Sequence, residues 1–288
     1  MFRKCLKVIL SSMMMLFFLL GCTVSKDGLY QLSNQSYSQM MSYIIRWGDS
    51  VVVVDGGMAE DEANLIQNIK KISDDNTVDA WIITHYHQDH TGALAKYLES
   101  KSEDIKIKKI YYNFPSRDWV SKHDADCLSE YDIISNALST FNSKVIVSKN
   151  MDISTPDLQI KVIRTFNPEI TVNGGNNSSS VYKVTCNNKT ILFLGDLGEE
   201  GGEELIKDCK EEIENMDYVQ MAHHGQAGVS KEVYQIIHPK YCLWPTPDWL
   251  WINKDHQYQT DLTKEWIKEI GVKKNYVADK GTIKIDLK

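Results

Sequence analysis

The chain has 288 residues, of which 42% are hydrophobic and 25% are charged, a composition typical of a globular protein with a sizeable core. Its formal net charge of −7 argues mildly against non-specific nucleic-acid binding, which usually needs a basic surface, although a local basic groove is not excluded. Strand-like and helix-like segments alternate along the chain without a repeat or an obvious linker.

The first 21 residues have the features of a targeting segment that does not belong to the fold. Arg3, Lys4 and Lys7 precede an apolar run, residues 8–20, that is too short to span a membrane comfortably. The run ends in Leu19-Leu20-Gly21-Cys22, which resembles the lipobox of bacterial lipoproteins. A plain signal peptide or a short membrane anchor is the alternative interpretation.

The lipobox resemblance implies cleavage before Cys22 and a lipid on its sulfur. Such a lipid would anchor the protein to the bacterial cell membrane, facing the extracytoplasmic side. Residues 22–38 are then predicted to be the lipidated cysteine and a polar spacer that leads into a first edge strand, and residues 39–288 to be the folded domain. The cysteines after residue 22 are widely and irregularly spaced, so they form no metal motif and we expect them to be packed.

The folded part is predicted to begin with a β-hairpin. Residues 41–46 and 51–54 read as two strands joined at the Gly48-Asp49 turn. The second strand is apolar throughout, as expected of a strand that is buried on both faces. It stops at Asp55-Gly56-Gly57, where Asp55 by itself is no more than a turn residue. Residues 60–72 then have the apolar spacing of a helix.

The most informative stretch is Thr84-His85-Tyr86-His87-Gln88-Asp89-His90-Thr91-Gly92, which follows the apolar strand at residues 81–83. Because alternate residues of an extended chain point the same way, His85 and His87 can present two imidazoles to one metal. Asp89 and His90 lie where the chain turns into a helix, and they can face a second metal. Imidazole and carboxylate ligands suit zinc, with manganese as the alternative.

Two further motifs follow in the second half of the chain. The apolar strand at residues 190–194 ends in Gly195-Asp196, and the strand at residues 217–222 runs into His223-His224-Gly225. The remaining predicted elements are helices at 91–100, 124–141, 199–215, 231–237 and 260–270, strands at 145–147, 158–165, 180–185, 241–244, 275–278 and 282–287, and a loop at 173–177.

This order of motifs resembles the signature of the metallo-β-lactamase superfamily, a group of mostly dinuclear metallohydrolases. The resemblance implies an α/β fold, the αββα sandwich, in which two mixed β-sheets pack face to face with helices outside. It implies two divalent metal ions and a role for Asp55 in supporting the metal-binding loop. The metal ligands that it implies are His85, His87, Asp89, His90, Asp196 as the bridging carboxylate, and His223.

The chain departs from the usual pattern at one ligand. A typical member has a third histidine in the first metal site, on a loop roughly twenty residues before the bridging aspartate, but here that loop carries Asn176 and Asn177. The departure disfavours a typical β-lactamase, glyoxalase or lactonase. The run Asn177-Ser178-Ser179-Ser180 and the His-His-Gly motif are similar to the hydrolase domain of the DNA-uptake (ComEC-type) competence protein. Asn177 is therefore expected to support the site.

The resemblance implies a metal-activated hydroxide that attacks a phosphorus or carbonyl centre. Asp89 would orient this nucleophile or accept its proton, and His224 or His256 would protonate the leaving group. His256 is equally well explained as a surface residue. The favoured substrate is a phosphodiester; the alternatives are an exported hydrolase of lactone, thioester or β-lactam bonds, or a non-catalytic binding module. The membrane is the only further partner expected, through the lipid anchor on Cys22.

Overall fold

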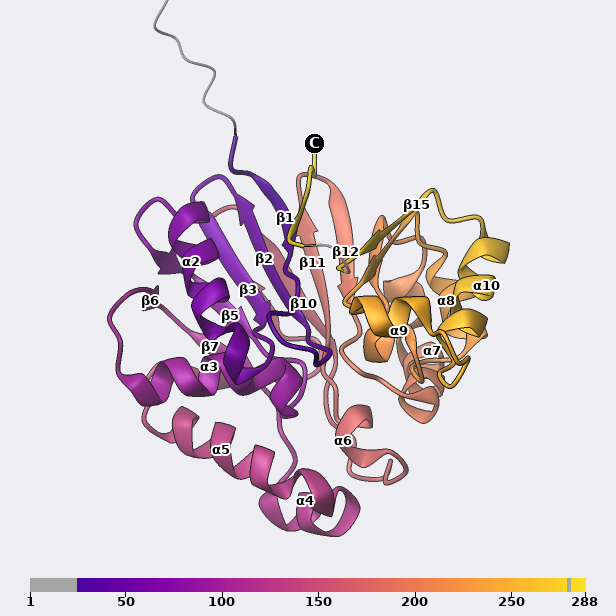
Figure 1. The fold of residues 1–288 in the computed structure, drawn as a ribbon, viewed down its shortest axis with the longest axis horizontal. Coiled ribbons are helices and arrows are strands. Elements are labelled where there is room, and N and C mark those ends of the chain that lie inside the picture. Colours follow the sequence, from indigo (N-terminus) through magenta and orange to yellow (C-terminus); the bar gives the residue numbers. More distant parts are fainter. Residues whose placement is uncertain (1–24, 279–280) are drawn as a thin grey trace, which may run out of the picture.

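The computed structural model describes residues 25–278 and 281–288, so the predicted signal segment and Cys22 lie outside the described residues. The chain folds into two seven-stranded β-sheets that pack face to face, with helices covering their outer faces (Figure 1). This arrangement confirms the predicted αββα sandwich.

The first sheet is mixed. Its strands β1, β2 and β3 are antiparallel, whereas β3, β5, β7 and β8 run parallel to one another. The order across the sheet is β16 (Ile283–Ile285), β1 (Gly28–Gln31), β2 (Ser42–Trp47), β3 (Ser50–Asp55), β5 (Ala80–Ile82), β7 (Ile110–Tyr112) and β8 (Lys144–Ile146).

The start of this sheet differs from the predicted spacer. β1 lies between β16 and β2, so it is not an edge strand, and Leu29 and Leu32 are buried in the core. Because most of residues 22–38 are polar, the sequence gives no sign that Leu29 and Leu32 are buried. The first sheet thus already includes β1 from Gly28, ahead of the predicted boundary at residue 39.

The second sheet is also mixed. Strands β12 to β15 are parallel, and β9 to β12 are antiparallel. The order across the sheet is β15 (Lys274–Val277), β14 (Tyr241–Trp244), β13 (Tyr218–Gln220), β12 (Lys189–Phe193), β11 (Val181–Cys186), β10 (Gln159–Arg164) and β9 (Asp152–Ser154). A separate pair of short strands consists of β4 (Thr77–Val78) and β6 (Lys106–Ile107).

The helices form the two outer layers. Apolar side chains of α2 (Glu62–Ile72), α3 (Gln88–Ser100) and α5 (Leu128–Ser139) pack on the first sheet. Those of α7 (Glu199–Ile213), α8 (Lys231–Ile237) and α10 (Thr260–Ile270) pack on the second. The short helices are η1 (Ala59–Asp61), α4 (Arg117–His123), η2 (Ala125–Cys127), α6 (Gly174–Asn177), η3 (Ala222–Gly225) and α9 (Asp248–Ile252).

Apolar packing between the sheets accounts for much of the core. Tyr43 of the first sheet meets Phe193 of the second edge to face, with ring centroids 5.3 Å apart. Burial of such aromatic rings removes a large apolar area from water. The two sheets are therefore held in a fixed relation, and loops from both can form one site.

The short helices α4, α6 and α9 were not expected. α4 begins just after Pro115, and Ser116 caps it by accepting a hydrogen bond from the amide of Trp119 at 3.2 Å. The predicted loop at residues 173–177 contains the single turn α6. Short helices of this kind have too few residues to show apolar periodicity.

The cysteines of the described residues can be compared with their predicted packing. Cys186, Cys209 and Cys242 are buried and Cys127 is half-buried, and none of the four forms a disulfide within residues 25–278 and 281–288. Among the residues that the structure describes, no helix is both long enough and apolar enough to cross a membrane.

Candidate metal centre

The candidate site lies where the carboxyl ends of parallel strands from the two sheets meet. Asp55 ends β3, and the histidine stretch follows β5, its parallel neighbour in the first sheet. Asp196 follows β12, and His224 lies in η3 after β13, its parallel neighbour in the second sheet. Residues distant in sequence are thereby brought together at one edge of the sandwich.

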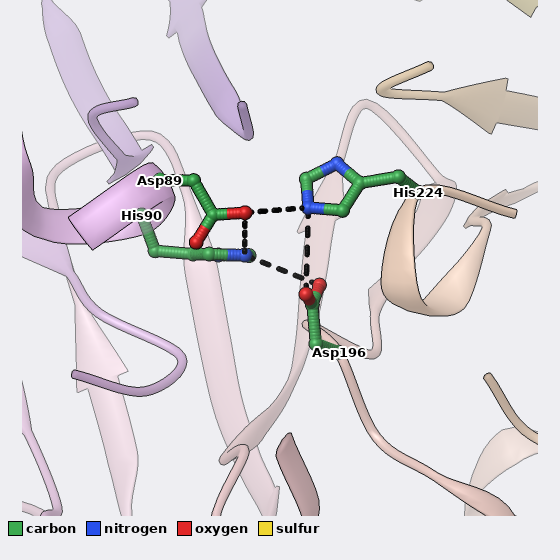
Figure 2. A group of neighbouring side chains, drawn as sticks. All are labelled: Asp89, His90, Asp196 and His224. Carbon is green, nitrogen blue, oxygen red and sulfur yellow. Dashed lines mark hydrogen bonds and ion pairs between the residues drawn. The ribbon is translucent and has the colours of Figure 1, made fainter. Parts of the chain in front are cut away.

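Four of these side chains form a compact group: Asp89, His90, Asp196 and His224, which we call the four-residue cluster (Figure 2). Each contributes one nitrogen or oxygen atom, and these atoms lie within 4.8 Å of one another. His224 Nε2 is 3.0 Å from Asp89 Oδ2 and 3.4 Å from Asp196 Oδ2. His90 Nε2 is 3.2 Å from Asp196 Oδ1.

Supporting contacts turn both imidazoles toward the centre of the cluster. His90 Nδ1 lies 2.7 Å from Asp55 Oδ2, and Asp55 also accepts hydrogen bonds from the amide and the hydroxyl of Thr84. His224 Nδ1 lies 2.8 Å from the carbonyl oxygen of Pro245, which can only accept, so this nitrogen carries the proton. Both Nε2 atoms are left to face a metal, as metal-binding histidines usually are.

Several buried polar atoms here lack a hydrogen-bond partner among the residues that the structure describes. These atoms are His85 Nε2, His90 Nε2 and Asp196 Oδ1. His90 Nε2 and Asp196 Oδ1 lie 3.2 Å apart but form no hydrogen bond with each other. Leaving such atoms unsatisfied costs about 1–3 kcal/mol each, whereas a divalent cation would satisfy them. The nitrogen and oxygen donors therefore fit a transition metal such as zinc, iron or manganese.

The electrostatics of the cluster favour a bound cation. Burial lowers the pKa of His90, but the surrounding carboxylates outweigh this effect and raise it well above the usual range. The same opposing effects raise the pKa of His224 to about 9. Burial raises the pKa of Asp196, but the neighbouring imidazoles lower it well below its usual value. A divalent cation can replace the protons that these groups would otherwise hold.

An unusual turn selects which of the two adjacent histidines points inward. His223 and His224 both have left-handed backbones, with φ of +48° and +54°, which is uncommon for residues other than glycine. The turn is held by a hydrogen bond from the His223 amide to the Gly195 carbonyl and by one from the Thr246 hydroxyl to the His224 carbonyl. As a result, the side chain of His224 is fully buried.

This placement differs from the predicted ligand set, in which His223 was the metal ligand. His223 is partly exposed, and its Nε2 lies 3.9 Å from Asp196 Oδ2. Its Nδ1 lies 3.3 Å from the carbonyl oxygen of Ala227. The structure therefore places His224, and not His223, in the cluster.

The predicted first-site histidines lie beside the cluster. The ring of His85 is buried, and its centroid lies 4.2 Å from that of His90 and 4.6 Å from that of His87. His87, however, pairs through Nε2 with Asp124 Oδ2 at 2.9 Å. A second group of ligating atoms thus consists of His87, Asp124 and Cys127. Asp124 and Cys127 were missed because two such residues three positions apart are no signal in sequence alone.

Two other predicted site residues lie elsewhere. Asn177 accepts hydrogen bonds from the amides of Gly198 and Gly201, both at 3.0 Å, and donates to Val172 and Glu200. Its amide thus holds the start of α7 and contributes nothing to the two groups of ligating atoms. His256 is 82% exposed and pairs with Asp261 at 2.7 Å. Neither group of ligating atoms includes it.

The fold and the site can now be compared with known proteins. Structures of similar fold include YhfI from Bacillus subtilis, a metallo-β-lactamase fold protein, with 14% identity, 90% of this chain and 100% of that chain covered, and a TM-score of 0.54. Zn(2+)-bound PqqB from Methylobacterium extorquens is 11% identical, with 86% and 88% covered and a TM-score of 0.54. At such identities the likeness shows the fold alone.

A third structure is CmlA, a diiron β-hydroxylase from Streptomyces venezuelae, with 12% identity and a TM-score of 0.57. The alignment covers 92% of this chain and 55% of CmlA, so the chain spans about half the length of that protein.

A comparison with curated protein sequences finds no match. The model of the metallo-β-lactamase superfamily matches residues 38–241, which is more than half of the sequence. The chain therefore belongs to the metallo-β-lactamase superfamily.

Proposed function

We propose that this protein is a metal-dependent hydrolase whose reaction takes place at the four-residue cluster. The observation that carries the proposal is the convergence of two carboxylates and two imidazoles on one point, in a buried place where polar atoms lack partners. A module that binds its ligand without a metal would gain nothing from this costly burial. We therefore prefer an enzyme to a non-catalytic binding module.

The side chains of the cluster have different roles in this proposal. A bound divalent ion supplies a Lewis acid and makes water a stronger acid. Asp196 lies between the two imidazoles of the cluster, at distances that suit a shared ligand. The Nδ1 proton of His224 is committed to Pro245, so His224 serves as a ligand and does not protonate the leaving group.

Asp89 connects the cluster with the space for a substrate. It lines a cavity of about 240 Å³ together with Gln39, Gln88 and Glu130. Its Oδ2 lies 3.3 Å from Gln39 Nε2 and 3.0 Å from His224 Nε2. A carboxylate in this position can orient a water molecule toward the cavity and hold its proton.

We propose a phosphodiester-type substrate that carries an aromatic group, as a nucleotide does. The similarity of the motifs to the ComEC-type hydrolase domain supports the phosphodiester. A neighbouring pocket supports the aromatic group, because Tyr37 stacks on Trp249 there with ring centroids 5.7 Å apart. Tyr37 lines this pocket, and the next two residues of the chain, Ser38 and Gln39, line the cavity at Asp89. Aromatic side chains stack readily on nucleobases.

We also propose that the protein is held on the outer side of a bacterial cell membrane by a lipid on Cys22. The support is the sequence Leu19-Leu20-Gly21-Cys22 after a short apolar run. Because β1 begins at Gly28, the anchor would keep the domain close to the membrane surface.

A hydrolysis screen tests the proposed reaction. Protein lacking residues 1–21 is reconstituted with zinc or with manganese and offered a chromogenic phosphodiester, a β-lactam, a lactone and a thioester. We expect turnover of the phosphodiester, a loss of about 100-fold or more in the Asp196→Ala variant, and no change in the matched His256→Ala variant. Preferred turnover of a β-lactam, lactone or thioester would refute the substrate class. Absence of turnover in all four assays by a metal-loaded protein would favour a binding module.

A further inference from the structure

A second group of ligating side chains lies beside the four-residue cluster. It consists of His87, Asp124 and Cys127, and we call it the His87 group. One ligand atom from each lies within 4.8 Å of the others. His87 Nε2 is 2.9 Å from Asp124 Oδ2, and Cys127 is the last residue of the short helix η2, three positions after Asp124. The group is half-buried and faces the cavity that His87 and Cys127 line.

The backbone at Gly175 passes close to the His87 group, and the missing side chain leaves space for that group. A Cβ atom at Gly175 would lie 2.3 Å from His87 Nε2 and 2.2 Å from Asp124 Oδ2. Any side chain at position 175 would therefore displace both groups. Gly175 directly precedes Asn176 and Asn177 in the loop where the sequence lacks the third histidine, and the carboxylate of Asp124 lies against this glycine.

One more donor is adjacent. His85 is fully buried, its Nε2 has no hydrogen-bond partner in the described part of the chain, and its ring centroid is 4.6 Å from that of His87. An imidazole next to a carboxylate, a second imidazole and a thiol makes a donor set that proteins use for transition metals.

We propose that the His87 group binds a second divalent metal ion, with Asp124 in place of the missing third imidazole and Cys127 as a thiolate ligand. This inference deepens the proposed function and rests on it for the role of the neighbouring cluster. A site with nitrogen, oxygen and sulfur donors favours zinc or cobalt over manganese, because thiolate is a soft ligand. The two sites would therefore differ in metal preference.

A simpler role for Asp124 makes a different prediction. Its carboxylate accepts a hydrogen bond from the Tyr86 hydroxyl at 2.6 Å and can orient His87 by a hydrogen bond alone. In that case no metal contacts Cys127. The sulfur of Cys127 is thus the atom that separates a metal site from a hydrogen-bonded pair.

Reconstitution with cobalt gives a direct test, because a cobalt–thiolate bond produces a charge-transfer absorption band. We expect the wild-type chain without residues 1–21 to bind two equivalents of cobalt and to show this band. Cys127→Ser should abolish the band, and Gly175→Ala should remove the second equivalent by filling the space. The exposed neighbour of Cys127 provides the matched control Asp126→Asn, which should behave as wild type.

The possible outcomes separate this inference from the proposed function. A wild-type protein that binds one equivalent, shows no thiolate band and still hydrolyses its substrate would overturn the second site and leave the hydrolase intact. Two equivalents with an unchanged spectrum in Cys127→Ser would also overturn it. Two equivalents with the band, but without hydrolysis, would support the second site and count against the proposed function.

Discussion

His224 and His223 offer an internal comparison, because they are adjacent histidines of which only one lies in the four-residue cluster. We predict that His224→Ala lowers the affinity for zinc far more than His223→Ala does. His224 contributes one of four donor atoms, and it lies 3.0 Å from Asp89 and 3.4 Å from Asp196. Without it, the buried carboxylate of Asp196 and the partly exposed carboxylate of Asp89 also lose the imidazole that lies close to both.

The magnitude follows from the role of the lost group. Removing a residue that merely orients a ligand lowers metal affinity about 10–100-fold. Losing a ligand should cost at least the upper value, about 100-fold, which is about 2.7 kcal/mol. His223 is partly exposed and 3.9 Å from Asp196, so its removal should change affinity by less than about threefold, a fraction of the supporting-group effect.

Competition with a chromophoric chelator measures both affinities, and thermal unfolding of the metal-free variants shows whether each is folded. If His223→Ala loses as much affinity as His224→Ala, or more, the turn at η3 does not select the inner histidine and the assignment in the cluster is wrong.

Three further predictions concern other parts of the chain. Asp55→Asn should lower zinc affinity about 10–100-fold, because Asp55 holds Nδ1 of His90, and an unchanged chelator titration would contradict this role. Asn177→Ala should lower the free energy of unfolding by about 2–4 kcal/mol, because the amides of Gly198 and Gly201 lose their acceptor, and a denaturant midpoint equal to that of the wild type would show that water replaces it. Cys22→Ala should leave the precursor uncleaved and without lipid in the producing cell, whereas a band of mature size would refute the lipoprotein assignment.

The sequence predicts the fold well because the motifs coincide with secondary structure. The apolar run before His85 forms a buried strand, and the helix that carries Asp89 and His90 begins directly afterwards, at Gln88. The hairpin at Gly48 also forms as expected, since glycine tolerates the φ of +58° found there.

The details that sequence does not predict depend on backbone turns and on distant contacts. Two consecutive histidines in left-handed conformation decide that His224, not His223, points inward. The direction of His87 depends on Asp124, which lies between α4 and η2, and on the absence of a side chain at Gly175. No local pattern reveals such contacts.

The role of Asn177 could not be predicted from the sequence either, because it depends on contacts with distant residues. Its position in the loop suggested that it supports the metal site, but its side chain is committed to four hydrogen bonds that hold α7 and the preceding loop. Replacing it with histidine would therefore break these bonds and would not supply the missing ligand.

The most direct test of the central claim is the zinc content of the purified protein without residues 1–21 after dialysis against zinc. Asp196 touches both imidazoles of the four-residue cluster, so Asp196→Ala provides the matched comparison. We predict at least one equivalent of zinc in the wild type and a strong loss in the variant. Zinc at background level in the wild type, or equal zinc in both proteins, would contradict a metal centre at this cluster.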